Sequence, residues 1–222
     1  ALTASATKTV ADDIMRHLKF PEPHILRSSF ARPNLSYSVR RTDDKNGQLL
    51  RLVRNVPGTG IVYVRTREGT EQIADLLRQE GTTAAAYHGG LGHAERSLRQ
   101  EEWLSGKTRV MVATNAFGMG IDKSNVGFVI HYNMPKSLEA YYQEAGRAGR
   151  DGEPAECILL YGQGDVTTAQ FFLQQAGENH EALTPQQAAQ VQYRDQLRLE
   201  DMVAYCKTKA CLRGKLLDYF GQ

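Results

Sequence analysis

Residues 60–90, which read GIVYVRTREGTEQIADLLRQEGTTAAAYHGG, decide the fold class because their apolar residues change period twice. The apolar run at 60–64 predicts a buried strand, and the run at 82–87 predicts a second one. Between them, residues 66–79 place apolar side chains on one face of a predicted helix, and Gly81 stands where a helix end favours a left-handed residue. A strand, a helix and a strand in this order indicate one unit of a parallel sheet.

The same alternation continues along the chain. Further strands are predicted at 109–113, 128–132 and 157–161, with a helix at 94–104. Together these elements predict an α/β fold with a mainly parallel sheet and helices on both faces. In such sheets, ligands bind beyond the carboxyl ends of the strands.

The last part of the chain has a different character. Residues 165–220 contain no clear strand and predict a small subdomain of several helices, with a connection at 177–185. The composition, with 41% hydrophobic and 23% charged residues, is that of a soluble globular protein. No apolar run is long enough to span a membrane, so no membrane partner is expected. The net charge of +2 means that any nucleic-acid binding must come from local clusters.

Residues 113–123, ATNAFGMGIDK, form the first cluster with chemical potential. Its two glycines allow a tight turn and a close approach to a ligand, while Thr114 and Asp122 supply a hydroxyl and a carboxylate. By itself the pattern also fits a plain turn after a strand, in which Asp122 bonds its own backbone.

Residues 142–152, YQEAGRAGRDG, form the second cluster. Gln143, Arg147 and Arg150 are spaced i, i+4 and i+7, which is one face if a helix continues that far. The two glycines are poor helix formers, but they leave space around the two guanidiniums. Two converging arginines suit a phosphate, whereas the alternative is a solvated surface on which they pair with neighbouring carboxylates.

The third cluster joins residues 64–68, VRTRE, to residues 87–91, YHGGL. Thr66 and Arg67 stand at a strand end that opens a helix, where exposed backbone amides suit a phosphate. His88 stands before a Gly-Gly turn, where a histidine is more often a structural hydrogen-bonding residue than a catalyst.

Taken together, the clusters resemble the second half of the motor of a helicase of the second superfamily. The stretches that carry this resemblance are ALTASAT (1–7), IVYVRTREGTEQIADLL (61–77), AAAYHGGL (84–91), VATNAFGMGIDKSNV (112–126) and YYQEAGRAGRDG (141–152). Others resemble the RecQ family in particular: SSFARPNLSY (28–37), FGMGIDK (117–123), HYNMPKSLEAYYQE (131–144) and CLRGKLLDYFG (211–221). DEAD-box RNA helicases share the QxxGRxGR pattern but lack FGMGIDK and CLRGKLLDYFG.

The resemblance implies three regions. Residues 1–29 would be the end of the first motor domain and a linker, with the amino terminus taken as a cut. Residues 30–161 would be a second RecA-like motor domain, and residues 162–222 the helical part of a zinc-binding subdomain. The activity implied is that of an ATP-dependent 3′–5′ DNA helicase of repair and recombination. Its partners would be single-stranded and duplex DNA and the first motor domain of the same polypeptide.

The resemblance also implies residue roles. Arg150 would be the arginine finger that reaches the γ-phosphate of ATP, supported by Arg147 and Gln143, and Asp122 would face the nucleotide or relay between nucleotide and DNA. Phosphates of the tracking strand would be held by the third cluster and the first, namely by Thr66, Arg67, His88 and Thr114.

Cys211 would be the first of four Zn²⁺ ligands, the others following residue 222. The family usually has two arginines after this cysteine, whereas this chain has Leu212-Arg213. Cys157 and Cys206 are expected to be buried thiols rather than ligands. The three cysteines are too few and too unevenly placed for a disulfide framework. That usage fits a reducing compartment: cytoplasm or nucleoid in a bacterium, nucleus in a eukaryote.

The chain has neither a GxxxxGK[ST] loop nor a DExH segment. Those belong to the first motor domain, which would bind most of the ATP and Mg²⁺, so residues 1–222 are expected to be inactive alone. The alternatives are an RNA-remodelling helicase with the same motor and a non-catalytic scaffold with a decayed motor, against which the two arginines of the second cluster speak. A dinucleotide-binding enzyme is discarded because Ile121-Asp122-Lys123 replaces the third glycine of GxGxxG.

Overall fold

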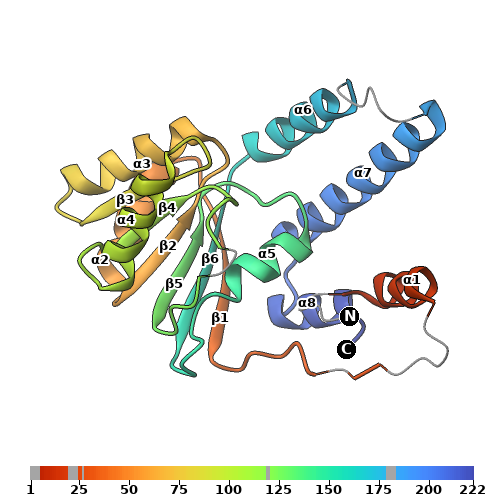
Figure 1. The fold of residues 1–222 in the computed structure, drawn as a ribbon, viewed down its shortest axis with the longest axis horizontal. Helices are drawn as coiled ribbons and strands as arrows, with labels where there is room; N and C mark the ends of the chain where they lie inside the picture. The colour runs from red at the N-terminus through yellow and green to blue at the C-terminus, as the bar shows by residue number, and fades with distance from the viewer. Residues whose placement is uncertain (1–5, 20–24, 27, 119–120, 179–183) are drawn as a thin grey trace.

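The computed structural model describes residues 6–19, 25–26, 28–118, 121–178 and 184–222. Within them, one sheet has the strand order β1-β6-β5-β2-β4-β3, and neighbouring strands are parallel. The strands are β1 (Leu35–Arg41), β2 (Thr59–Tyr63), β3 (Ala84–Tyr87), β4 (Val110–Ala113), β5 (Val126–His131) and β6 (Ala155–Tyr161). This sheet confirms the predicted α/β fold class (Figure 1).

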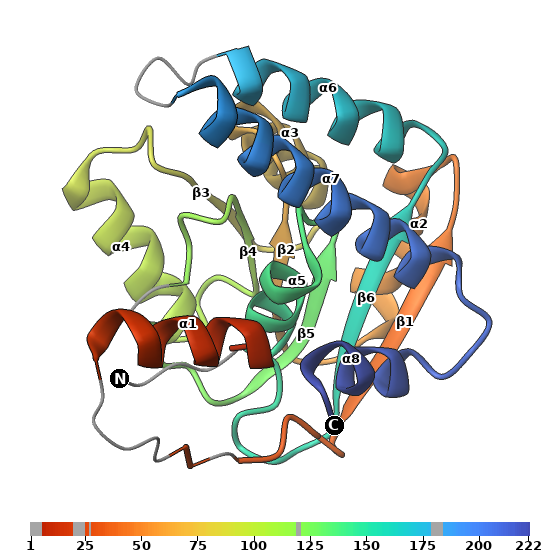
Figure 2. The same ribbon diagram turned by 90° about the vertical axis from the view of Figure 1, so that its right-hand side faces the viewer.

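Helices pack on both faces of the sheet (Figures 1 and 2). The helices of the described residues are α1 (Lys8–Leu18), α2 (Lys45–Asn55), α3 (Arg67–Gln79), α4 (His93–Leu104), α5 (Leu138–Ala145), α6 (Gly164–Glu178), α7 (Pro185–Lys207) and α8 (Leu212–Phe220). Of these, α1 lies away from the sheet and contributes no described residue to its cores (Figure 1). Among the described residues, no helix is both long enough and apolar enough to cross a membrane.

The two faces of the sheet carry separate hydrophobic cores, because alternate side chains of a strand point to opposite sides. One core contains Val62 and is covered by α2 and α3. The other contains Ile61 and receives Trp103 from α4, Tyr141 from α5 and Met202 from α7. In Figure 1, α5, α7 and α8 accordingly lie on the opposite side of the sheet from α2 and α3. The carboxyl-terminal helices are thus packed on the sheet through a shared core.

Three elements of the fold, α1, β1 and α2, were not predicted from the sequence. β1 pairs with β6 at the edge of the sheet, and of its residues only Leu35 is buried, so the apolar pattern is weak. α2 follows it and buries Leu49 and Val53. The predicted strands are all present, with ends that differ by one or two residues, and the helical character of residues 165–220 is confirmed.

The predicted connection at 177–185 falls mostly on residues 179–183, which lie outside the described residues. The same holds for most of ALTASAT, since the description starts at residue 6. Thr7, at its end, is the N-cap of α1, where its hydroxyl accepts a hydrogen bond from the Val10 N–H at 3.4 Å.

Candidate functional site: two arginines and three strand ends

The four predicted DNA-binding residues follow the carboxyl ends of three strands that are neighbours in the sheet. Thr66 and Arg67 follow β2, His88 follows β3, and Thr114 follows β4. Because parallel strands end at the same edge, the fold brings these residues to one side of the molecule. We call them the strand-end group.

Hydrogen bonds to the local backbone already engage the two threonines. Thr66 is the N-cap of α3 and its hydroxyl accepts from the Gly69 N–H at 3.0 Å. The Thr114 hydroxyl accepts from the Ala116 N–H at 3.4 Å, and the residue is buried. These contacts set the course of the backbone, as N-caps do at the start of a helix.

Arg67 and His88 meet around Gly90. The Gly90 N–H donates to His88 Nδ1 at 3.2 Å, and a Cβ built on Gly90 would lie 3.3 Å from Arg67 Nη1. His88 Nε2 lies 3.2 Å from Glu71 Oε1, so both ring nitrogens have partners. His88 is therefore a buried residue that shapes the turn, while Arg67 is exposed and carries the positive charge of the strand-end group.

The second cluster does not lie on one helical face. α5 ends at Ala145 with Gly146 as its C-cap, and turns follow over residues 146–151. Gly149 has φ +54°, in the left-handed region, so a right-handed helix cannot pass through it. The shared face for Gln143, Arg147 and Arg150 was expected only if the helix continued that far, and it does not: Gln143 is exposed on α5, and both arginines lie beyond the helix.

Both arginines contact the loop that follows β4. Arg147 Nη1 donates to the Gly118 carbonyl at 2.6 Å. Arg150 Nη1 lies 3.2 Å from the Ile121 carbonyl and 3.3 Å from Asp122 Oδ1. Asp122 and the two arginines are thus brought together as expected, although through carbonyls of the loop rather than through a helix.

Gly118 leaves the space that Arg147 occupies. A Cβ on Gly118 would lie 2.1 Å from Arg147 Nη2, whereas a Cβ on Gly149 would meet Asn34 Nδ2 at 2.6 Å. A Cβ on Gly146 would meet the Tyr142 carbonyl at 2.9 Å. The prediction that the two glycines of the second cluster make room for the guanidiniums is therefore wrong, because that room is made by a glycine of the first cluster.

The loop at 114–122 joins the strand-end group to the arginines. It starts at Thr114, whose N–H donates to the Tyr87 carbonyl at 3.1 Å, next to His88. It then passes Gly118 and reaches Asp122; residues 119–120 of the predicted FGMGIDK motif lie outside the described residues. One short segment therefore contacts both candidate sites.

Two residues hold the turns at 146–151, which carry Arg147 and Arg150 and are called the arginine turns below. Neither was predicted as a site residue. Arg32 donates to the carbonyls of Ala148 at 3.1 Å and Gly149 at 2.8 Å, and Asn34 Nδ2 donates to the Gly149 carbonyl at 2.8 Å. Both belong to SSFARPNLSY, which the sequence offered only as a point of resemblance. Their polar side chains directly before β1 were the available signal.

The cysteines differ in burial. Cys157 and Cys206 are buried, as expected, and burial raises the pKa of each thiol to about 12, so both stay protonated near neutral pH. Cys211 is exposed at the N-cap of α8. No group of three or more metal-binding side chains occurs among the described residues. Because structural Zn²⁺ takes four ligands, Cys211 could supply one of the four.

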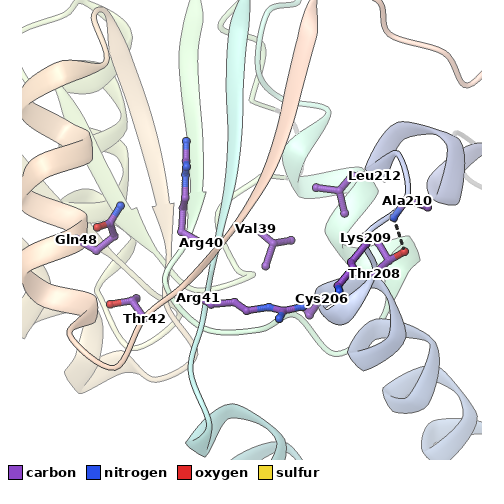
Figure 3. A pocket seen from close by; sticks show the side chains of 10 residues that line it. All are labelled: Val39, Arg40, Arg41, Thr42, Gln48, Cys206, Thr208, Lys209, Ala210 and Leu212. Carbon is purple, nitrogen blue, oxygen red and sulfur yellow. Dashed lines mark hydrogen bonds between the residues drawn. The ribbon is translucent and has the colours of Figure 1, made fainter.

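An open cavity of about 600 Å³, lined in part by Cys206, lies between the end of β1 and the α7–α8 connection (Figure 3). In Figure 3, Arg41 extends from β1 toward Cys206 and Thr208, and its Nη2 donates to the Lys207 carbonyl at 2.9 Å. None of the predicted site residues lines this cavity.

Comparison with known proteins points to one family. Residues 44–152 match the helicase conserved C-terminal domain, and residues 163–222 match the RecQ zinc-binding family. The chain is 42% identical to the ATP-dependent DNA helicase RecQ of Bacillus subtilis, with 100% of this chain and 36% of that protein covered. It is also 42% identical to the ATP-dependent DNA helicase hus2/rqh1 of Schizosaccharomyces pombe, covering 100% of this chain but 16% of the relative.

Among solved structures, a DEAD box protein from Methanococcus jannaschii superposes with a TM-score of 0.54 and 29% identity, over 64% of this chain and 40% of that one. The helicase motor fold is thus common to both groups, whereas the match at 163–222 and the sequence matches over the whole of this chain are to RecQ-type helicases, of which the chain spans only 36% and 16%. The chain belongs to the RecQ helicase family.

Proposed function

We propose that this chain forms part of an ATP-dependent DNA helicase and supplies the arginines that act on the γ-phosphate of ATP. The observation that carries the proposal is the loop at 114–122, which contacts both arginines and starts within the strand-end group. Arg150 is the arginine finger, supported by Arg147 and Gln143. The hydrogen bonds from Arg150 to the Ile121 carbonyl and to Asp122 Oδ1 are long, at 3.2 and 3.3 Å, and the Asp122 side chain is 92% exposed. The Arg150 guanidinium is therefore free to turn toward a phosphate.

Phosphoryl transfer needs positive charge at the γ-phosphate in the transition state. ATP and Mg²⁺ would be held mainly by the first motor domain of the same polypeptide, because these 222 residues have no GxxxxGK[ST] loop. Arginines from a second domain reach the phosphate only when the two domains close, so hydrolysis is linked to domain movement. Asp122 lies on the loop that relays this movement.

The strand-end group would hold the phosphates of one DNA strand, with the exposed Thr66 and Arg67 as direct contacts and the buried His88 and Thr114 shaping the turns beside them. Contacts of this kind read the backbone rather than the bases, so binding would be largely independent of sequence. With each closure the phosphate-binding residues of the two domains shift along the strand. Repeated cycles give translocation and unwinding, with 3′–5′ polarity proposed for the whole protein.

The proposed second motor domain spans 30–161, after the end of the first motor domain and a linker at 1–29. The zinc subdomain follows at 162–222, where Cys211 supplies one Zn²⁺ ligand.

The RNA-remodelling alternative is favoured by one observation, the structural likeness to a DEAD box protein. Matched DNA and RNA duplexes with a single-stranded 3′ or 5′ tail, unwound by the full-length protein with ATP, separate the two. We expect unwinding of the DNA duplex with the 3′ tail. Preferential unwinding of RNA would overturn the DNA assignment, and equal unwinding from a 5′ tail would overturn the polarity.

A further inference from the structure

A row of buried aromatic rings lies beneath the loop that carries the arginine contacts. Tyr63, at the end of β2, is 4% exposed, and its hydroxyl donates to the Phe117 carbonyl at 3.1 Å. The neighbouring carbonyl, that of Gly118, accepts the bond from Arg147. Tyr63 and Arg147 therefore hold consecutive carbonyls of the same loop.

The Tyr63 ring is itself held by a buried polar pair. His131, which is 1% exposed, stacks on Tyr63 with ring centroids 5.3 Å apart and planes 22° apart. His131 Nε2 lies 2.9 Å from Glu144 Oε2, and the Arg147 N–H donates to the Glu144 carbonyl at 3.2 Å. The pair thus joins β5 to the last turn of α5, directly before the arginine turns.

We propose that Tyr63 is a positioning residue for Arg147 and that the His131–Glu144 pair keeps Tyr63 in place. The inference rests on the proposed role of the arginines at the nucleotide. Burial raises the pKa of the Tyr63 hydroxyl, although the positive charge of Arg147 opposes this shift, so the hydroxyl remains a neutral hydrogen-bond donor. A neutral donor that bridges to the loop fixes the position of the Gly118 carbonyl, and that carbonyl fixes the guanidinium. Since Tyr63 lies three residues before Thr66, it also connects the strand-end group to the arginines.

The test is Tyr63→Phe in the full-length protein, which removes the hydroxyl and keeps the ring. We expect the ATPase turnover number at saturating single-stranded DNA to fall about five- to tenfold, the equivalent of one buried hydrogen bond. The KM for ATP should stay within about twofold, because the interaction serves the transition state. The matched control is Tyr205→Phe on α7, whose ring is equally buried and packs on Tyr141. It should lower neither turnover nor KM.

A second pair of variants tests the polar pair without touching Tyr63. Glu144→Gln keeps an acceptor for His131 and should retain most of the turnover, while Glu144→Ala should lose as much as Tyr63→Phe. Tyr63 and Glu144 both act on turnover through the position of the Gly118 carbonyl. The Tyr63→Phe/Glu144→Ala double variant should therefore lose little more turnover than either single variant. Melting temperatures of all variants identify losses that come from unfolding.

The result that overturns the inference is wild-type turnover in Tyr63→Phe, or an equal loss in Tyr205→Phe. Additive losses in the double variant would also overturn it, since they would place Glu144 on a separate path. Arg147→Ala, measured alongside, separates this inference from the proposed function. If Arg147→Ala turns over normally, the proposed function fails; if it is impaired while Tyr63→Phe is normal, only the positioning role of Tyr63 fails.

Discussion

Gly118→Ala should disable the arginine site without touching either arginine. The added Cβ would lie 2.1 Å from Arg147 Nη2 and 2.4 Å from its Cζ, so the guanidinium must move. Its bond to the Gly118 carbonyl, 2.6 Å long, is then lost or lengthened. A hydrogen bond to a charged group contributes about 1.5–3 kcal/mol, which corresponds to about 10- to 150-fold in rate if it serves the transition state. Gly118 also has φ +153°, a backbone conformation that costs a residue with a side chain about 1–3 kcal/mol.

The assay is steady-state ATPase of the full-length variant at saturating ATP and single-stranded DNA. Gly81→Ala is the matched control, because Gly81 has φ +80° but no atom within 4 Å of the added Cβ. It should lower the melting temperature and leave turnover unchanged, which separates backbone strain from the clash with Arg147. If Gly118→Ala retains wild-type turnover, the Gly118 carbonyl does not position Arg147 and the account of the loop is wrong.

Three further predictions follow from the same arrangement. Asp122→Ala in the full-length protein should lower DNA-stimulated ATPase or uncouple it from unwinding; wild-type unwinding per ATP would remove Asp122 from the relay. Cys211→Ser should lower zinc content and stability, measured by metal analysis and thermal unfolding, whereas Cys206→Ser should leave zinc bound because that thiol is buried and protonated. Equal zinc loss in both would show that the ligand was wrongly chosen. Residues 1–222 purified alone should show no ATPase activity, and DNA-stimulated hydrolysis by them would contradict the need for a second motor domain.

The parts of the fold that the sequence predicts well are those buried on both faces. β2 and β4 are short apolar runs inside the sheet, and their signal is unmistakable because every side chain must be apolar. β1 is at the sheet edge and mixes buried with exposed residues, so its pattern resembles that of a polar loop. β3 lies at the opposite edge but is buried along its whole length and was predicted, so β1 was missed because of its exposure and not because of its edge position.

The sequence names candidate site residues, but it does not predict which atoms of these residues contact one another. The residues alone placed Asp122 in one cluster and Arg147 and Arg150 in another, and only the family resemblance assigned the three to one site. The structure brings Asp122 and Arg150 into contact, while their role at ATP stays a prediction. The sequence could not indicate that Gly149 adopts a left-handed conformation, which turns the arginines off the helix. Nor could it pair Arg147 with the Gly118 carbonyl, because that contact depends on how two distant segments of the chain pack.

The most direct test of the central claim is the ATPase turnover of Arg150→Ala in the full-length protein. Arg150 has a side chain that is 36% exposed and bonds only weakly to the loop, so its removal should leave the fold intact. A guanidinium that acts mainly in the transition state affects turnover more than binding. We expect turnover to fall by about 10² or more, on the scale of arginine fingers, and unwinding to fail with it. ATP and single-stranded DNA should still bind within about a few-fold of wild type. Near-normal turnover would contradict the arginine-finger assignment, and lost ATP affinity with normal turnover would make Arg150 a binding residue instead.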